Sequence, residues 1–240
     1  MNWAALRSLV WADGRRVARD AFLGWMAVVP LAMALTLRSL AEPIRGAVDG
    51  ADEANRWLGI IDGAFFAIVL PLVMGAVLGF MLLDEKDNHT LTAIRATPVS
   101  VGAYLAWRTT AVGLFTIVVV TVTHPIAGLS SSGGLGDFLT ALAGAPLAGS
   151  FGMGLAAAAA NKIQGFALVK LALAALLLPC VGAALGGAWL WATIWLPSWW
   201  PLMVHSAGGQ GGLGWAPLIG DYAVNVLIIL TAVRHLGATN

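Results

Sequence analysis

Three polar residues interrupt or border the long apolar runs of this sequence, and their side chains suit contact with a polar solute. They are Asp62, Asp221 and Asn225, and the last two are four residues apart, which places them on one face of a helix. Ionisable residues within a membrane mark pathways for ions or substrates. Both aspartates also stand at predicted helix starts, where the helix dipole favours a hydrated carboxylate. These residues are therefore a candidate translocation pathway, and hydrated helix ends are the alternative that their positions favour.

The other chemically active residue types form no recognisable site. His89, His124, His205 and His235 are scattered through the sequence, so no metal centre is predicted. The single cysteine, Cys180, lies in an apolar run and is expected to be a small packing residue. The sequence has no Gly-x-x-x-x-Gly-Lys-Ser/Thr motif, which is the phosphate-binding loop of many ATPases. We therefore predict no catalytic residue, metal or cofactor in this chain, and no enzyme activity of its own.

Composition indicates an integral membrane protein. Of the 240 residues, 59% are hydrophobic and only 10% are charged, and the mean hydropathy is +0.84. A soluble domain has about 25% charged residues, so this chain lacks the polar groups to cover a surface in water. A bilayer core of about 30 Å is crossed by roughly 20 helical residues. The net charge of +1, without a basic tract, gives no reason to expect a nucleic-acid partner.

The elements that position the polar residues are six predicted membrane-spanning helices in one all-α domain, residues 1–240. Continuous apolar runs favour helices over a barrel, whose strands alternate between apolar and polar residues. Two small-xxx-small steps, Gly75–Gly79 and Gly182–Gly186, favour close contacts between helices. The predicted spans are about Ala21–Leu37, Asp62–Leu83, Ala103–Ala127, Phe138–Ala160, Phe166–Leu190 and Pro217–Val233.

The distribution of basic residues predicts that both termini are cytoplasmic. With this orientation the external Lys and Arg residues are only Arg38, Arg45 and Arg56, and the other ten of the 13 are cytoplasmic. Cytoplasmic loops carry the excess of Lys and Arg in membrane proteins. Residues 1–20 combine an apolar helical stripe with several arginines, which predicts an interfacial helix on the inner leaflet.

Residues 84–100, in the cytoplasmic loop between the second and third predicted spans, are the most informative segment. They are predicted to form a charged exit from the membrane and then a short helix. Asp87 or Asn88 can cap the start of this helix, and Pro98 disfavours helical geometry in the residue before it. From the pattern alone, an ordinary solvated loop is an equally good interpretation.

The segment resembles the coupling-helix loop of ABC-2-type transporter permeases. That loop commonly reads Glu-Lys-Glu-Arg-Gly-Thr-Leu, then some four residues, then Thr-Pro-Val. His89 stands where the family often has glycine, and Arg95 stands where it often has an apolar residue. Within the family, the run from Thr97-Pro98 to Tyr104-Leu105-Ala106 is most similar to actinobacterial fluoroquinolone-export permeases. The residues in register without a gap are Glu85, Lys86, Asp87, Thr90, Leu91, Thr97, Pro98 and Val99.

This resemblance implies a membrane-spanning exporter subunit in a bacterial cell membrane, driven by a separate dimer of ABC ATPase subunits that binds ATP and Mg²⁺. It also implies a second permease chain, identical or related. The helix around Thr90–Ala96 would enter a groove of the ATPase, with Leu91 and Ile94 seated in it and Glu85 and Arg95 setting the electrostatic fit. The residues expected to couple the permease to the ATPase are Glu85, Thr90, Leu91, Ile94, Arg95 and Pro98.

Residues 190–216 are the second segment that the resemblance interprets, because ABC-2 permeases are similar in having a partly inserted hairpin between spans five and six. Tryptophans favour the membrane interface, and broken apolar helices at that depth suit a re-entrant element buried against protein. A simple aromatic belt around a surface loop is the alternative. The tryptophans of this region are Trp189, Trp191, Trp195, Trp199, Trp200 and Trp215.

Three other classes of function compete with an ATP-driven exporter. A gradient-driven secondary transporter needs ionisable relays at mid-membrane, and an intramembrane enzyme needs paired catalytic groups there; neither is evident in the sequence. A non-transporting accessory membrane protein is compatible with it. Few charges in the spans favour an apolar or amphipathic cargo, such as a drug, a lipid or a peptide.

Overall fold

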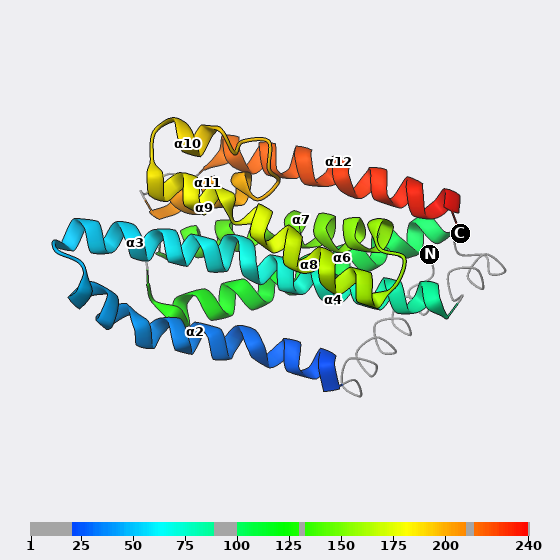
Figure 1. The fold of residues 1–240 in the computed structure, drawn as a ribbon, viewed down its shortest axis with the longest axis horizontal. Helices are drawn as coiled ribbons and strands as arrows, with labels where there is room; N and C mark the ends of the chain where they lie inside the picture. Colours follow the sequence, from blue (N-terminus) through cyan, green and yellow to red (C-terminus); the bar gives the residue numbers. More distant parts are fainter. Residues whose placement is uncertain (1–20, 89–99, 130–132, 210–213, 240) are drawn as a thin grey trace.

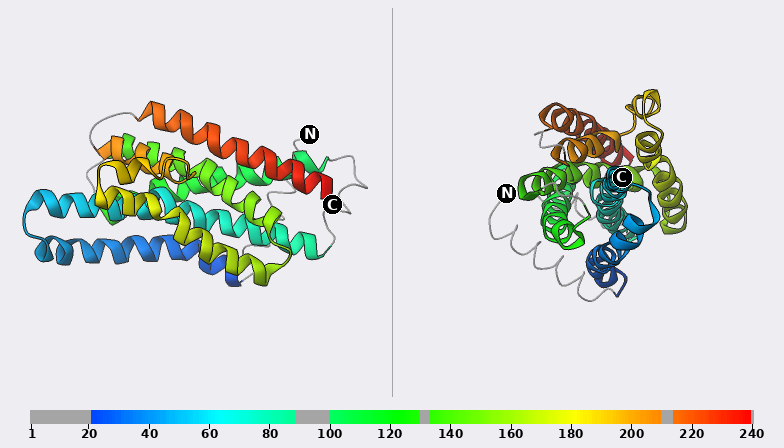
Figure 2. Two further views of the ribbon diagram at one scale, coloured as in Figure 1. Left: turned by 45° about the horizontal axis from the view of Figure 1, so that its top comes forward. Right: turned by 90° about the vertical axis from the view of Figure 1, so that its left-hand side faces the viewer.

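The computed structural model describes residues 21–88, 100–129, 133–209 and 214–239, and every regular element in these ranges is helical. The helices run along the long axis of an elongated bundle (Figure 1, Figure 2). In chain order they are α2 (Ala21–Ala47), α3 (Ala51–Gly63), the π-helix η1 (Ala64–Val69), α4 (Leu70–Asp87), α6 (Val101–Ala127), α7 (Gly133–Ala158), α8 (Lys162–Leu176), α9 (Leu178–Leu185), α10 (Ala188–Trp191), α11 (Trp199–Gly209) and α12 (Trp215–Thr239).

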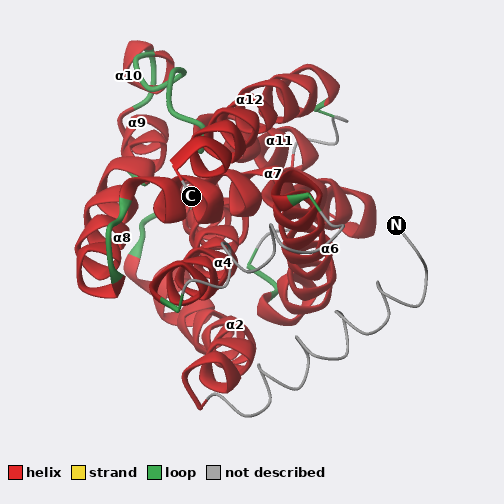
Figure 3. Cartoon of the chain, turned by 90° about the vertical axis from the view of Figure 1, so that its right-hand side faces the viewer, coloured by secondary structure: helices red, strands yellow, loops and turns green. Residues whose placement is uncertain are grey.

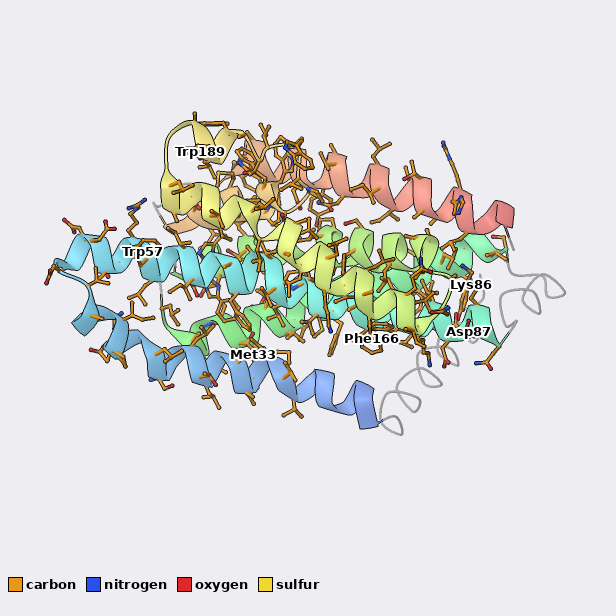
Figure 4. All side chains as sticks on the ribbon, in the orientation of Figure 1. Met33, Trp57, Lys86, Asp87, Phe166 and Trp189 are labelled. Carbon is orange, nitrogen blue, oxygen red and sulfur yellow. The ribbon has the colours of Figure 1, made fainter. Side chains whose placement is uncertain are left out.

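The two ends of the bundle differ in their side chains. Lys86 and Asp87 lie at the end where α4 finishes, which we call the proximal end (Figure 4). Trp57 and Trp189 lie toward the opposite end, which we call the distal end (Figure 4). The last residues of α12 and the first residues of α6 are proximal, whereas the turn between α2 and α3 is distal (Figure 1).

Five helices in the described part of the chain are long and apolar enough to cross a membrane. They confirm the prediction of a multi-pass, all-helical membrane protein. The helix α2 has 27 residues but is not among the five, so the sixth span and the orientation in the membrane stay predictions. The five are Ala51–Asp87, Val101–Ala127, Gly133–Ala158, Lys162–Leu185 and Trp215–Gly237.

The second predicted span is much longer than the sequence indicated. Helix α3 already begins at Ala51 and continues through η1 into α4, so Asp62 lies within a helix of 37 residues. Asp52 and Glu53, expected in an external loop, stand in the first turn of α3. Their charge is favourable there because the free N–H groups give a helix start partial positive charge. The apolar run alone therefore marked only the later part of this helix.

Helices α4 and α7 form the interior of the bundle, and α2, α6, α8 and α12 lie around them (Figure 3). Glycines allow the two backbones to approach closely. A Cβ atom on Gly75 would overlap the Ala148 carbonyl oxygen, and one on Gly152 would lie 2.6 Å from the Gly75 carbonyl oxygen. The predicted Gly75–Gly79 step is thus a helix contact within one chain.

The fifth predicted span, Phe166–Leu190, is wrong at its distal end. The helix breaks between α8 and α9, and α9 ends at Leu185, followed by Gly186 and Gly187, which have φ values of 73° and 57°. Glycine adopts this region without the steric cost that a Cβ atom adds. Ser198 donates a hydrogen bond of 2.6 Å from its hydroxyl to the Leu176 carbonyl at the break. The broken backbone is therefore stabilised by the segment that follows it.

The tryptophan-rich segment between α9 and α12 is folded against the bundle. Its helix α11 packs on α7, α12 and η1, and Trp199 is buried. By contrast, Trp189, Trp191 and Trp195 are exposed. Re-entry of residues 190–216 into the membrane stays a prediction, and the structure contributes two features that suit it: short broken helices and an outward row of tryptophans.

Candidate transport site

Asp62 is buried in the distal half of the bundle instead of capping a hydrated helix end. Its carboxylate has no exposed surface, and its Oδ2 lies 2.9 Å from Nε2 of His124 in α6. The same oxygen lies 3.7 Å from Nε2 of His205 in α11. Two histidines that looked scattered in the sequence therefore meet one carboxylate. The preferred interpretation of Asp62 as a hydrated end was wrong.

Close packing and a second layer of polar groups surround this cluster. A Cβ atom on Gly63 would lie 2.8 Å from Cδ2 of His205, so glycine is what lets α11 approach α3. Phe66 stacks on His124 with ring centroids 4.5 Å apart. From α7, Asp137 Oδ1 lies 3.3 Å from His124 Nδ1, and Thr140 Oγ1 lies 3.2 Å from His205 Nδ1.

A second buried network joins α12 to α7. The Asn225 amide donates a hydrogen bond of 2.8 Å to Asp221 Oδ1, and the Ser150 hydroxyl donates one of 2.5 Å to Asn225 Oδ1. Asp221 and Asn225 share a helix face as predicted, but both are fully buried. Since α12 begins at Trp215, Asp221 lies in its second turn, so a hydrated end does not describe it either. Ser150 was not predicted, because nothing in its small-residue surroundings distinguishes it.

An open apolar groove of about 370 Å³ lies next to this network, between α7, α8 and α12. Ser150 is part of its wall and links it to Asn225 and Asp221. Hydrocarbon side chains make up nearly all the rest of the lining. The residues are Leu147, Ser150, Phe151, Gly154, Leu155, Ala158, Leu168, Leu171, Ala172, Ala175, Leu176, Pro197 and Ile228.

At the proximal end, Glu85 is held inside the bundle. Its side chain is 1% exposed and forms an ion pair with Arg108 of α6. The Tyr104 hydroxyl donates a hydrogen bond of 2.9 Å to Glu85 Oε1 and accepts one of 3.0 Å from Arg108 Nε. A buried carboxylate does not match the expectation that Glu85 itself meets a partner surface. Tyr104 and Arg108 were not predicted, although their spacing of four and the isolated charge in an apolar run were signals.

The first residues of the predicted coupling loop, before its predicted helix, are fixed to neighbouring helices. Asp84 pairs with Lys162 at 2.7 Å, and Lys86 donates to the Ala159 carbonyl at 3.2 Å. Asn88 closes the end of α4 by donating from its side-chain amide to the Asp84 carbonyl, and its predicted role at the start of the next helix lies with residues outside the described ranges. The remaining predicted coupling residues lie outside the described residues; they are Thr90, Leu91, Ile94, Arg95 and Pro98.

Comparison with known proteins agrees with the permease class that the sequence indicated. Residues 13–233 match the family model described as "Fluoroquinolones export permease protein Rv2686c-like". The chain is 30% identical over 178 residues to the fluoroquinolones export permease protein MT2760 of Mycobacterium tuberculosis (strain CDC 1551 / Oshkosh), covering 73% of this chain and 70% of the relative. The same identity and coverage relate it to the fluoroquinolones export permease protein Rv2686c of Mycobacterium tuberculosis (strain ATCC 25618 / H37Rv). The chain therefore belongs to the Rv2686c-like family of fluoroquinolones export permease proteins.

Proposed function

We propose that this chain is the membrane-spanning subunit of an ATP-driven exporter that moves an apolar or amphipathic, drug-sized compound across a bacterial cell membrane. A separate dimer of ATPase subunits would bind ATP and Mg²⁺. A second permease, identical or related, would complete the transporter. The names of the relatives support export of a drug-like cargo, and the observation that carries the proposal is the groove between α7, α8 and α12.

The groove suits a drug-sized molecule in volume and chemistry. Sites for such ligands measure about 300–1,000 Å³ and combine apolar walls with a few polar groups. Here the volume is about 370 Å³, and the Ser150 hydroxyl is the polar group that the Asp221–Asn225 network holds in place. Leu171 of α8 and Leu227 of α12 are exposed on the helices beside the groove. An amphipathic cargo would therefore enter from the lipid, with its polar group near Ser150.

Energy would reach the groove through the proximal ends of α4 and α6. The predicted coupling helix follows α4 directly, and the Glu85–Arg108 ion pair ties the last turns of α4 to α6. Because α7 packs on α4, α6 and α12, a displacement at the proximal end is passed to the helix that carries Ser150. The contact with the ATPase would come from Leu91 and Ile94, while Glu85 would hold their attachment point in position.

Fluoroquinolone accumulation in cells provides the first test. Gly154 lines the groove, and a Cβ atom there would meet no atom within 4 Å, so the side chain of Gly154→Leu would project into the groove. This variant should restore fluoroquinolone accumulation to the level of cells without the transporter. Gly134→Leu, at the distal end of the same helix and equally open, is the matched control and should export normally. Normal export by Gly154→Leu would remove the groove from the pathway.

Co-purification of an ATPase provides the second test. A variant carrying both Leu91→Asp and Ile94→Asp should reach the membrane but lose the ATPase and fluoroquinolone export. Thr92→Asp places one carboxylate off the predicted Leu91–Ile94 face and should keep both the ATPase and export. If the wild-type chain co-purifies with no ATPase from its own host, under conditions that preserve other membrane complexes, ATP-driven export is contradicted.

A gradient-driven transporter is the second candidate, because one observation favours it. Asp62, His124 and His205 are buried and adjacent, and such ionisable groups within membranes form proton relays. The two mechanisms differ in their response to energy sources. Loss of efflux on ATP depletion with the proton gradient intact supports the exporter, whereas loss on adding a protonophore with ATP intact supports the alternative.

A further inference from the structure

We propose that Asp62, His124 and His205 form a binding site for a divalent transition metal of the zinc type. The three side chains each offer one ligand atom, and these atoms all lie within 4.8 Å of one another. They come from α3, α6 and α11, which are brought together by the tertiary fold. This inference does not rest on the proposed transport function.

The spacing of the three ligand atoms fits a tetrahedral ion. Zinc binds histidine nitrogen and carboxylate oxygen at about 2.0–2.2 Å, which places neighbouring ligand atoms about 3.3 Å apart. Asp62 Oδ2 lies 2.9 Å from His124 Nε2 and 3.7 Å from His205 Nε2. These two separations lie on either side of the ideal value, and all three ligand atoms lie within 4.8 Å of one another, so the side chains would close around an ion by moving toward a common centre.

An oxygen atom of α7 lies beside the Nδ1 atom of each histidine. The Thr140 hydroxyl donates its proton to the Gly136 carbonyl at 2.9 Å, so toward His205 Nδ1 it is an acceptor. The Asp137 carboxylate is likewise an acceptor beside His124 Nδ1. With its proton on Nδ1, each imidazole would direct an Nε2 lone pair toward a metal ion beside the Asp62 carboxylate. Metal-bound histidines have this second-layer arrangement, with a carboxylate or another oxygen at the outer nitrogen.

Without a metal, a proton on His124 Nε2 would make the 2.9 Å hydrogen bond to Asp62 Oδ2. A proton can supply positive charge at this site, but a divalent ion would bind all three ligand atoms at once. The charges also balance, because the carboxylates of Asp62 and Asp137 together neutralise a 2+ ion. Burial makes this balance important: the side chains of Asp62 and His124 are 0% and 2% exposed, and an uncompensated charge at such a site is costly.

The ligand types select among metals. Imidazole nitrogen suits zinc, copper, nickel and iron, whereas magnesium and calcium prefer oxygen ligands. Three protein ligands leave a fourth tetrahedral position, which a water molecule can take. The π-helix η1 begins two residues after Asp62, and such elements frequently occur at functional sites. The bound metal would tie α11 to α3 and α6.

Metal binding is best tested with the full-length chain, purified in detergent with a tag that contains no histidine. Co²⁺ and Zn²⁺ are the probes, because tetrahedral Co²⁺ has visible ligand-field bands and Zn²⁺ has none. Wild-type chain should bind one Co²⁺ per chain with these bands, and Zn²⁺ should displace it. This measurement needs no variant, so it does not depend on a substituted chain folding.

Variants then assign the ligands. Asp62→Asn and His205→Gln should abolish stoichiometric binding, and Thr140→Val should weaken it by about 10–100-fold, as loss of a second-layer partner does. His235→Gln, on exposed α12 surface, is the control and should bind as wild type does. Zn²⁺ should also raise the Tm of wild-type chain but not that of Asp62→Asn.

Two results would overturn the proposal. The first is wild-type chain with neither Co²⁺ bands nor a Tm shift with Zn²⁺, which would make the cluster an internal ion-pair network only. The second is undiminished binding by both Asp62→Asn and His205→Gln, which would place the metal elsewhere.

Discussion

The buried ion pair between Glu85 and Arg108 permits a quantitative test of how the proximal end is held together. The Arg108 guanidinium also bonds the Tyr104 hydroxyl through Nε at 3.0 Å and lies 3.9 Å from the Met81 sulfur through one terminal nitrogen. The pair joins α4 to α6 shortly before the predicted coupling helix around Thr90–Ala96. The informative perturbations are Glu85→Leu, Arg108→Met and the variant that carries both.

The magnitude follows from burial. The Arg108 and Glu85 side chains are 7% and 1% exposed, and removing one member of such a pair leaves the other charge buried, at a cost of about 3–5 kcal/mol. Replacing both with apolar residues of similar size is often close to neutral. Each single variant should therefore lose about 3–5 kcal/mol of unfolding free energy, and the double variant should recover most of that loss.

The assay is reversible unfolding of the purified chain in mixed micelles, followed by tryptophan fluorescence. Glu42 and Arg45 are the matched control, because they also form an ion pair, at 2.6 Å, but are 82% and 39% exposed. Glu42→Leu and Arg45→Met should each change stability by at most about 0.5 kcal/mol. Losses below about 1 kcal/mol in both buried single variants, or additive losses in the double variant, would refute the assignment of a buried, coupled pair.

Two further predictions concern packing and polar burial. Gly75→Ala should destabilise the chain by about 1–3 kcal/mol, because its Cβ atom would overlap the Ala148 carbonyl and overpacked contacts cost this much. Gly59→Ala, whose Cβ atom meets no atom within 4 Å, should instead stabilise the chain by about 0.5–1 kcal/mol. Equal unfolding midpoints for the Gly75→Ala and Gly59→Ala variants would contradict the close α4–α7 contact. Asn225→Ala should cost about 1–3 kcal/mol, because it leaves a buried polar partner in Asp221 without its amide donor. An unchanged unfolding midpoint for Asn225→Ala would show that water replaces the amide.

The sequence alone determined the features that depend on local pattern. Apolar runs with clustered charges predicted a helical membrane protein, because an isolated segment in lipid must satisfy its own backbone hydrogen bonds. Helical periodicity placed Asp221 and Asn225 on one face, and their side chains do bond. The register of residues 84–100 with a known coupling loop indicated a permease, and the family comparison confirmed that class.

Tertiary structure decided which helix faces meet. The local pattern of the sequence does not contain that information. Asp62 and His124 are 62 residues apart, and Glu85 and Arg108 are 23 apart, so no spacing rule connects them. The packing that brings these helices together depends on contacts such as those of Gly63 with α11 and Gly75 with α7, where a Cβ atom would clash. The charged side chains that looked like hydrated ends were buried for the same reason: a carboxylate can leave water once the packing of other helices supplies its partners.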